Sequence, residues 1–403
     1  MAEILIIGAG GVGNVVAHKC VQHPDVFSTV TLASRRIEKC EAIRDRKSIP
    51  IQTEQVNADK VGELEQLIQR VVPDIVINSA LPGTNLPIME ACLSQGVHYV
   101  DTSAPEPDTT TYELFAYSHQ LKFHSAFKEK NLTAVLSCGF APGVTNIFCA
   151  HALKEHFDEI HYVDIVDCNG GDHGHPFATN FDPFTNIAEI IQPCMHFQEG
   201  KWIESEALKT FRSFPFPNIG TRKMVQMYHE ELESLVAFLP DLKRIRFWMT
   251  FTDSYLQHLD AFRNIGLTGL APIQHKGMEI VPLEFLKTLL PDPSELAPGY
   301  TGKTCIGCQI EGLSGGQWKR FFIYNICDHQ ASFRELGSQA ISYTTGVPAM
   351  ISAMLIAQGS WQKPGVHCCE QLNPSPFLEQ LNRCGLPWVE TEVEMTLNED
   401  LKS

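Results

Sequence analysis

The sequence predicts an α/β protein, with a doubly wound parallel sheet and a second mixed α/β domain inserted before C-terminal helices. An apolar strand at the N-terminus leads into a glycine-rich turn and a helix. Strand-like and helical segments then alternate, a pattern typical of a parallel sheet whose strands are connected by helices. After that region strand-like segments dominate. We therefore expect one domain at residues 1–147, completed by residues 340–403, and another at residues 148–339.

The first element is the run Ile4–Ile7, which is too short for a helix and has the uniform apolar character of a strand buried on both faces. Gly8, Gly10 and Gly13 follow it in the pattern G-x-G-x-x-G, and residues 14–20 continue as a helix. In a dinucleotide site such glycines permit a tight turn and close approach of the pyrophosphate, while the helix N-terminus attracts the phosphates. The order strand, glycines, helix therefore predicts a Rossmann-type dinucleotide-binding domain.

The second strand, residues 29–33, ends in Ser34, Arg35 and Arg36. NAD-specific folds often place an acidic residue here to hold the ribose hydroxyls, whereas a small hydroxyl followed by arginines suits a 2′-phosphate. We therefore expect NADP, bound as NADPH, to be the cofactor. The alternative interpretation is a solvated basic turn.

Further strands at residues 74–78, 97–103 and 132–136, with a helix at residues 63–70, continue the alternation, and Val56–Asp59 closes a third strand. The carboxyl ends of the strands in a doubly wound sheet meet at the edge that binds the ligand. The predicted cofactor-binding residues are Gly8, Gly10, Gly11, Val12, Gly13, Ser34, Arg35, Arg36, Asp59, Asn78, Ser79, Ala80, Leu81, Asp101, Thr102 and Ser103.

In the second half of the chain, strand-like segments separated by turns replace the alternation of strands and helices. Residues 160–166, 244–251 and 319–326 resemble the strands of an antiparallel sheet, and residues 283–290 are expected to form a short helix. The apolar segment 346–358 is expected to be a helix that is too short to span a bilayer and that packs back on the first domain.

The composition argues against several classes of partner. The chain has 403 residues with 31 basic and 47 acidic side chains, a formal net charge of −16, which argues against nucleic acid and anionic membranes as partners. The N-terminus enters a strand directly, so we expect no signal peptide and a cytoplasmic protein. The 13 cysteines are odd in number and scattered, which favours reduced thiols over a disulfide framework.

Three further motifs are not assigned a chemical role. Residues 298–304 resemble a phosphate-binding loop but lack its first glycine, because position 297 holds Ala297. Residues 312–316 fit G-x-S-x-G, but they lie between strand-like segments and are expected to form a hairpin turn rather than a nucleophile elbow. Four residues have only a poor spacing for zinc, and we expect no metal: Cys305, Cys308, Cys327 and His329.

The stretch 164–181 packs acids, imidazoles and glycines directly after a predicted strand. Asp167 and Asp172 are candidates for attracting a cationic amine, and His173 or His175 for moving protons near neutral pH. The alternatives are a polar turn with capping side chains, or a metal site that lacks a convincing fourth ligand. Two arginines beside glycine turns have the fork geometry that suits a carboxylate, unless they are ordinary surface residues: Arg222 and Arg263.

Several motifs together resemble the saccharopine dehydrogenase family, and residues 167–181 most resemble its branch that forms carboxylated polyamines. The matching stretches are residues 6–13, 33–35, 99–103, 139–145 and 385–388. The resemblance implies a Rossmann domain completed by C-terminal helices, and a middle domain that also forms a homodimer.

The implied reaction joins the primary amine of diaminopropane or putrescine to the aldehyde of L-aspartate β-semialdehyde, and NADPH then reduces the imine. The resemblance also places Cys168 and Arg222 at substrate-facing positions. We expect His173 and Asp172 to be the catalytic residues, handling protons and recognising the amine. The expected substrate-binding residues are Cys168, His175, Asn180, Arg222 and Arg263.

Two positions depart from the family pattern. Relatives usually carry aspartate where this chain has Ala141, so either amine specificity has shifted or Asp172 takes over that role. Tyrosine often stands where this chain has Ala104, which counts against lysine-derived saccharopine as substrate. Two alternatives remain: a saccharopine reductase-like oxidoreductase, and a non-catalytic NADPH-binding protein in which Ala141 marks a decayed site.

Overall fold

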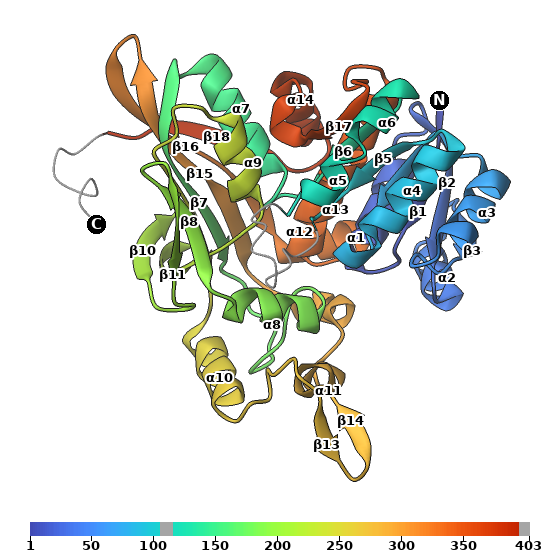
Figure 1. Cartoon of the computed structure of the whole chain (residues 1–403), viewed down its shortest axis with the longest axis horizontal. Coiled ribbons are helices and arrows are strands. Elements are labelled where there is room, and N and C mark those ends of the chain that lie inside the picture. The colour runs from blue at the N-terminus through green and yellow to red at the C-terminus, as the bar shows by residue number, and fades with distance from the viewer. Residues whose placement is uncertain (105–115, 395–403) are drawn as a thin grey trace.

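The computed structural model describes residues 1–104 and 116–394, which build two sheets lying side by side (Figure 1). The first sheet has seven parallel strands in the order β17-β6-β5-β4-β1-β2-β3. The strand order reverses between β1 and β4, which is where a doubly wound sheet opens its ligand crevice. The predicted fold class is confirmed. The strands are β1 (Ala2–Ile7), β2 (Phe27–Ser34), β3 (Gln52–Gln55), β4 (Ile75–Asn78), β5 (His98–Asp101), β6 (Thr133–Leu136) and β17 (Gly365–Cys368).

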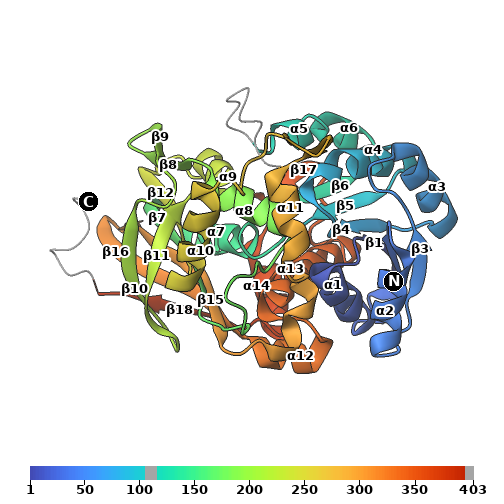
Figure 2. The ribbon, with the colours of Figure 1, turned by 90° about the horizontal axis from the view of Figure 1, so that it is seen from below.

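The helices of this half lie on both faces of the sheet, as parallel connections require. They include α1 (Gly11–Val21), α2 (Ile37–Arg46), α3 (Val61–Val71), α4 (Asn85–Gln95), α5 (Ser118–Leu121), α6 (His124–Glu129), α12 (His329–Leu336), α13 (Ala340–Ala357) and α14 (Pro374–Arg383), with a short 3₁₀ turn η1 (Pro82–Thr84) before α4. Helix α13 lies between the two sheets in both views (Figure 2). It crosses α1 so closely that a Cβ on Gly346 would lie 2.7 Å from Cβ of Val15.

Helix α13 is longer than the sequence suggested. It begins at Ala340 and has 18 residues. The expectation that this helix is too short to span a bilayer was therefore wrong. Its length and hydropathy satisfy the test for a membrane span, yet 83% of it is buried inside the protein. This degree of burial is what a core helix shows, because α13 packs against α1, α12 and α14.

The second sheet has nine strands, with the main order β10-β11-β12-β7-β15-β16-β18 and with β8 and β9 attached to β12. Most neighbours are antiparallel, as predicted, but β12 runs parallel to β7. The reason is the long connection between these two strands, which contains helices and can therefore cross over the sheet. The strands are β7 (Glu159–Asn169), β8 (Cys194–Gln198), β9 (Lys201–Ser205), β10 (Phe211–Phe216), β11 (Gly220–Met227), β12 (Arg244–Thr250), β15 (Lys303–Ser314), β16 (Gln317–Asp328) and β18 (Trp388–Glu392).

The remaining elements cover or extend this sheet. Helices α7 (Val144–Glu155), α8 (Pro183–Ile191) and α9 (Glu231–Phe238) lie near it, and an excursion below it contains α10 (Asp253–Asn264), the hairpin β13 (Ile273–His275) and β14 (Met278–Ile280), and α11 (Pro282–Leu289). Two 3₁₀ turns follow, η2 (Pro293–Glu295) and η3 (Ala297–Gly299), and η4 (Cys369–Gln371) follows β17.

Two of the motifs found in the sequence have structural explanations. Ser314 pairs with Gln317 across a two-residue turn, and Gly315 and Gly316 both have positive φ, so residues 312–316 form a hairpin turn as predicted. Cys305 and Cys308 pack into different apolar clusters on opposite faces of β15.

Candidate functional site

The glycine turn between β1 and α1 has the close packing that the motif predicts. Gly8 has φ of +113°, and a Cβ there would lie 2.6 Å from the carbonyl carbon of Ser79. A Cβ on Gly13 would lie 1.8 Å from the carbonyl oxygen of Gly8. The hydroxyl of Ser79 lies within hydrogen-bond distance of the Ile7 and Gly8 carbonyl oxygens, to which it donates, and so it stabilises the turn. Side chains are therefore excluded from this turn by backbone contact.

Gly10 is different, because a Cβ at Gly10 would meet nothing within 4 Å. Gly10 is the N-cap residue of α1, and no side chain caps the helix there. The first N–H groups of α1 therefore remain available to an anion. An open approach beside free N–H groups is the arrangement that a pyrophosphate needs. The residues present therefore fit a dinucleotide.

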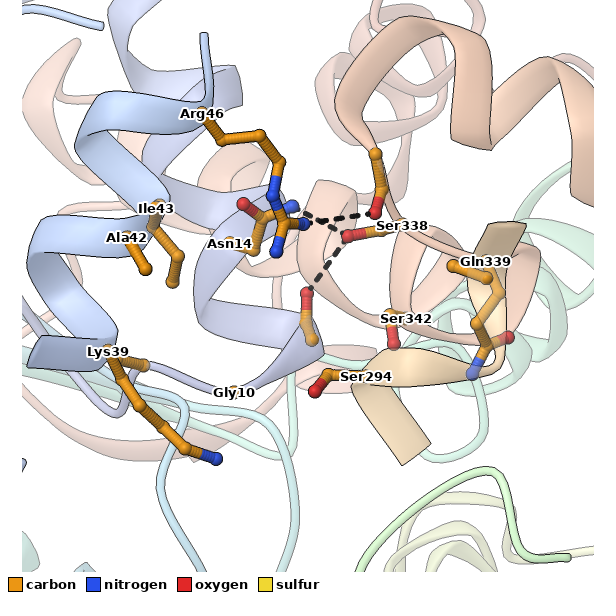
Figure 3. Close-up of a pocket in the computed structure, with 14 residues that line it drawn as sticks. Gly10, Asn14, Lys39, Ala42, Ile43, Arg46, Ser294, Ser338, Gln339 and Ser342 are labelled. Atoms are coloured by element: carbon orange, nitrogen blue, oxygen red, sulfur yellow. Dashed lines mark hydrogen bonds between the residues drawn. The ribbon is translucent and has the colours of Figure 1, made fainter. Parts of the chain in front are cut away.

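A cavity of about 100 Å³ adjoins this helix terminus (Figure 3). Lys39 and Arg46 project from α2 on one side, while Ser338, from the turn before α13, and Ser342, from its first turn, line the other. Ser294, from the second half of the chain, closes a third side. Cations and hydroxyls around a helix N-terminus suit a phosphate-bearing ligand.

Two contacts hold this cavity in shape. The side-chain amide of Asn14 donates to the Ser338 hydroxyl at 2.7 Å, which ties α1 to α13. The ammonium of Lys39 lies 3.2 Å from the carboxylate of Asp292, so the cavity joins the first domain to the segment before η2. Lys39 and Arg46 were not among the predicted cofactor residues.

The predicted cofactor residues fall into two groups. Arg35, Arg36 and Asp59 are exposed at the ends of β2 and β3, and the Ser34 hydroxyl accepts from the Arg36 N–H. Asp101, by contrast, is fully buried, where it accepts hydrogen bonds from the Ser137 N–H and the Gln120 amide.

Asn78 is also buried, and its amide donates to Asn85 and to the hydroxyl of Tyr99. Asn78, Ser79 and Asp101 thus shape the loops that border the crevice, whereas Leu81 is 51% exposed beside it. The contacts of these residues with a cofactor stay a prediction.

The loop predicted to be catalytic lies mostly in solvent. Asp172 is exposed, and its carboxylate accepts from the Gly174 N–H at 2.7 Å, an ordinary turn contact. His175 is exposed too, and its N–H donates to Nδ1 of His173. His173 packs edge-on against the ring of Tyr300, and burial lowers the pKa of His173. The polar-turn alternative therefore describes most of these contacts.

The other predicted substrate residues do not converge on one place. Cys168 is buried in an apolar cluster on the outer face of the second sheet, and burial raises the pKa of its thiol to about 12. Arg222 is exposed on β11, and Arg263 lies on α10 in the lower excursion. Asn180 accepts a hydrogen bond from the hydroxyl of Tyr300 and belongs to the packing around the loop.

A cluster that the sequence analysis missed lies where the two halves of the chain meet. His229 is 8% exposed and forms ion pairs through Nδ1 with Glu231 and Glu230, and through Nε2 with Glu189 at 3.2 Å. The Ala104 N–H donates to Glu230 at 3.3 Å. This contact brings the cluster against the loop that follows β5, at the carboxyl edge of the parallel sheet.

The cluster holds more carboxyl groups than it can neutralise. Glu231 is fully buried, and among the residues the structure describes its Oε1 has no hydrogen-bond partner. Asp167 and Glu370 lie close enough to interact electrostatically with Glu231. A buried carboxylate oxygen without a donor is costly, so this arrangement is suited to receive a cation.

The pKa shifts in the cluster follow from burial and like charge. Burial raises the pKa of Asp167 to about 7, with Glu231 adding to the shift and His229 opposing it. Burial likewise raises the pKa of Glu230 and of Glu370. Burial alone would lower the pKa of His229, but Glu231, Glu230 and Glu189 together raise it well above its ordinary value. Such shifts are typical of sites that bind charged ligands or move protons.

A weak sequence signal for the cluster exists. Residues 228–233 read Tyr-His-Glu-Glu-Leu-Glu, with apolar residues on either side. Three acids in a short helical turn are usually a solvated face, so their burial cannot be inferred without the fold.

The two halves of the chain match two domains of one protein family. Residues 4–135 match the saccharopine dehydrogenase NADP binding domain, and residues 139–386 match the saccharopine dehydrogenase C-terminal domain. The first domain is therefore an NADP-binding domain, which agrees with the cofactor expected from Ser34, Arg35 and Arg36.

Three named relatives are similar over almost the whole chain. The chain is 49% identical to carboxyaminopropylagmatine dehydrogenase of Synechocystis sp. over 391 residues, 97% of this chain and 98% of that protein. It is 45% identical to carboxynorspermidine synthase of Vibrio cholerae, and 44% identical to that of Vibrio alginolyticus, over 97% of each chain.

Among solved structures, apo saccharopine dehydrogenase (L-Glu forming) from Saccharomyces cerevisiae has a similar fold. The TM-score is 0.74 at 12% identity, over 98% of this chain and 100% of that chain. At this identity the similarity supports the architecture alone.

Proposed function

The chain belongs to the saccharopine dehydrogenase family, and from that premise we propose that it reductively joins a primary amine to an amino-acid semialdehyde with NADPH as reductant. The amine carries a second cationic group, as diaminopropane, putrescine and agmatine do. With L-aspartate β-semialdehyde the products are carboxynorspermidine, carboxyspermidine or carboxyaminopropylagmatine, which are precursors of polyamines. One NADPH and one proton are consumed, and one water is released.

The observation that carries this proposal is the carboxyl cluster around His229, in which Glu231 is fully buried and Glu189, Glu230 and Asp167 are partly buried. The unpartnered Oε1 of Glu231 can accept from an ammonium or guanidinium group, which would remove a cost that the free protein bears. Because the Ala104 N–H donates to Glu230, the carboxyl cluster lies beside the carboxyl end of β5, which supports this proposal. The reacting end of the amine would then reach the crevice that holds the cofactor.

In this proposal different acids bind the amine and transfer the proton. Glu230 and Glu231 would hold the far cationic end of the amine, and His229 would orient Glu231 through their hydrogen bond. Asp167 has a pKa of about 7 and can change protonation near neutral pH. Ionised Asp167 would take a proton from the reacting ammonium, and would then return it to the hydroxyl that leaves as water when the imine forms. Bound NADPH would supply the hydride.

This assignment moves the proposed proton transfer from His173 and Asp172 to Asp167. The exposed positions of Asp172 and His175 favour the change, because an exposed carboxylate gains little from pairing with an amine. Ala141 lies in the loop before α7, and we infer that the carboxyl cluster, rather than Asp172, takes the role of the acid that the family pattern has at this position.

The proposal covers more than one amine substrate, because the names of the relatives imply different amines. One relative is named for an agmatine product and two for norspermidine. The test is loss of NADPH absorbance with aspartate β-semialdehyde and one of three amines, diaminopropane, putrescine or agmatine, with NADH and amine-free reactions run in parallel. Oxidation that requires aldehyde and amine together supports the proposal, and oxidation with aldehyde alone would contradict it. Aminoadipate semialdehyde with glutamate serves as the control for a saccharopine reductase.

We also propose that the outer face of the second sheet pairs two copies of the chain. Trp318 is 44% exposed there and stacks on Tyr162, and the face carries its own apolar cluster. Arg244 lies over the Tyr162 ring on the same face, and aromatic residues with arginine are enriched at protein interfaces. Light scattering after size-exclusion chromatography tests this: a dimer that Trp318→Glu converts to a monomer supports the proposal, and a monomeric wild type rejects it.

A further inference from the structure

Three titratable side chains converge on the surface of the second domain. His151 and His156 lie at the C-terminal end of α7, and Glu390 lies on β18. Nε2 of His151 is 3.0 Å from Oε2 of Glu390, and Nε2 of His156 is 2.9 Å from the same oxygen. These side chains come from segments far apart in the sequence, and the cleft chemistry described above does not use them.

Aromatic packing fixes the two imidazoles. The ring of His156 stacks on Phe321 with centroids 4.2 Å apart, and the ring of His151 meets Trp388 edge-on at 5.1 Å. The side chains of His151, His156 and Glu390 are 13%, 20% and 35% exposed, so one side of the group remains open to water. The ligand atoms are thus held in place before anything binds.

We propose that His151, His156 and Glu390 form a binding site for a divalent transition-metal ion of the zinc type. Two imidazole nitrogens and one carboxylate oxygen are a donor set that Zn²⁺ accepts, with water completing the tetrahedron. The three ligand atoms lie within 4.8 Å of one another. Both Nε2 atoms lie within hydrogen-bond distance of the Glu390 carboxylate. A bound ion requires both Nε2 atoms to be unprotonated, with the proton of each imidazole on Nδ1.

A metal at this position would join two parts of the fold. Helix α7 begins beside Gly143, in a loop where a Cβ on Gly139 would lie 3.0 Å from the Thr102 carbonyl oxygen after β5, and it ends at the proposed ligands. Strand β18 is the last strand of the second sheet and pairs with β16. The ion would clamp β18 to α7 and stabilise the folded chain in proportion to its affinity.

A second group, Glu189, His229 and Glu230, also has ligand atoms close enough for a metal. It belongs to the proposed amine site, and the experiment must separate the two. His161 provides a matched control, since it forms a single ion pair with Glu159 at 2.9 Å and offers only one imidazole.

The test is calorimetric titration of Zn²⁺ into the chelator-treated full-length protein. We expect the double variant His151→Asn with His156→Asn to bind one Zn²⁺ fewer per chain than wild type, and to lose the rise in Tm that Zn²⁺ produces. Glu390→Gln should weaken binding at least tenfold, and His161→Asn should change nothing. Co²⁺ should give the visible absorption of a tetrahedral complex in wild type and not in the double variant.

Turnover of NADPH with amine and aldehyde should stay within twofold in the double variant, which separates this site from the cleft. Equal Zn²⁺ stoichiometry in wild type and double variant would overturn the proposal. Loss of the same site in the His161→Asn control would overturn it as well.

Discussion

Two segments of the second domain are rich in acids and histidines, but one is mostly exposed to solvent and the other is mostly buried. The loop Asp172–His175 stands in solvent, where its side chains close a turn on themselves. The segment His229–Glu233 is buried at the junction of the two domains and touches the loop after β5. In sequence the two segments are about equally rich, with three acids or histidines in four residues against four in five, while in space only the second holds a carboxylate oxygen without a donor.

The comparison shows that burial decides what a cluster of charges can do. Charges in water are already solvated and contribute little to binding. Charges in the interior lose that solvation, which shifts their pKa values and makes a complementary ligand favourable. The following predictions compare the two segments directly.

The largest effect is expected for Glu231→Gln. Removing the buried negative charge should lower kcat/KM for the amine roughly 30- to 1000-fold, equivalent to about 2–4 kcal/mol, because one charged partner of a buried pair is lost. Steady-state kinetics with the best amine measure this. The Kd of NADPH from fluorescence titration should change less than twofold, since the glycine turn is untouched. A normal kcat/KM would remove the cluster from the amine site.

The pH dependence of kcat/KM for the amine should follow the ionisation of Asp167. Its pKa of about 7 means that the carboxylate is protonated in acid and ionised above neutrality. If ionised Asp167 accepts the ammonium proton, kcat/KM for the amine should rise with pH with a midpoint at about pH 7, and should level off about one pH unit above it. Asp167→Asn should be slower and should keep only the pH dependence of the amine itself. An unchanged profile in this variant would assign the proton transfer elsewhere.

The same residue should affect stability in the opposite direction. The pKa of Asp167 is raised on folding, so its ionisation costs the native state stability from about pH 4 upward, and the cost stops growing above about pH 7. Asp167→Asn removes that cost. Its Tm should match wild type near pH 4 and exceed it above pH 7, by scanning calorimetry. Equal Tm values at pH 8 would mean that Asp167 is not desolvated.

The smallest effect is expected in the exposed loop. Asp172→Asn keeps the oxygen that accepts from Gly174, so stability should change by less than about 0.5 kcal/mol. Combined with His175→Asn, it should leave kcat/KM within twofold. A loss of more than tenfold would reverse the comparison and restore the loop as the catalytic segment.

Much of the fold could be predicted from local patterns. The strands at the N-terminus are short apolar runs bounded by turns, and the glycine motif has a geometric reason at each of its three positions. Strand β17 could not be predicted, because Gly365–Cys368 is short and its apolar neighbours are supplied by the distant strand β6. The parallel pairing of β12 with β7 likewise depends on a crossover that no local pattern records.

The site was harder to predict than the fold. The cofactor turn is a single contiguous motif, so its position follows from the sequence. The carboxyl cluster draws Asp167 from β7, Glu189 from α8 and Glu231 from α9, which only the tertiary structure brings together. The cavity beside Gly10 also needs Ser294 and Ser338 from distant segments. Residue type gave the chemistry of these groups, but their burial had to come from the fold.

The position of β17 at the edge of the first sheet has a consequence for synthesis on the ribosome. Strand β6 can pair with β5 early, but its other edge stays open until residues 365–368 have been translated. At about 5–20 residues per second the intervening stretch takes on the order of ten seconds or more to emerge. The nascent N-terminal half therefore exposes an unpaired strand edge while the strands of the second sheet from β7 to β16 are being made, and only β18 of that sheet is translated after the edge can close.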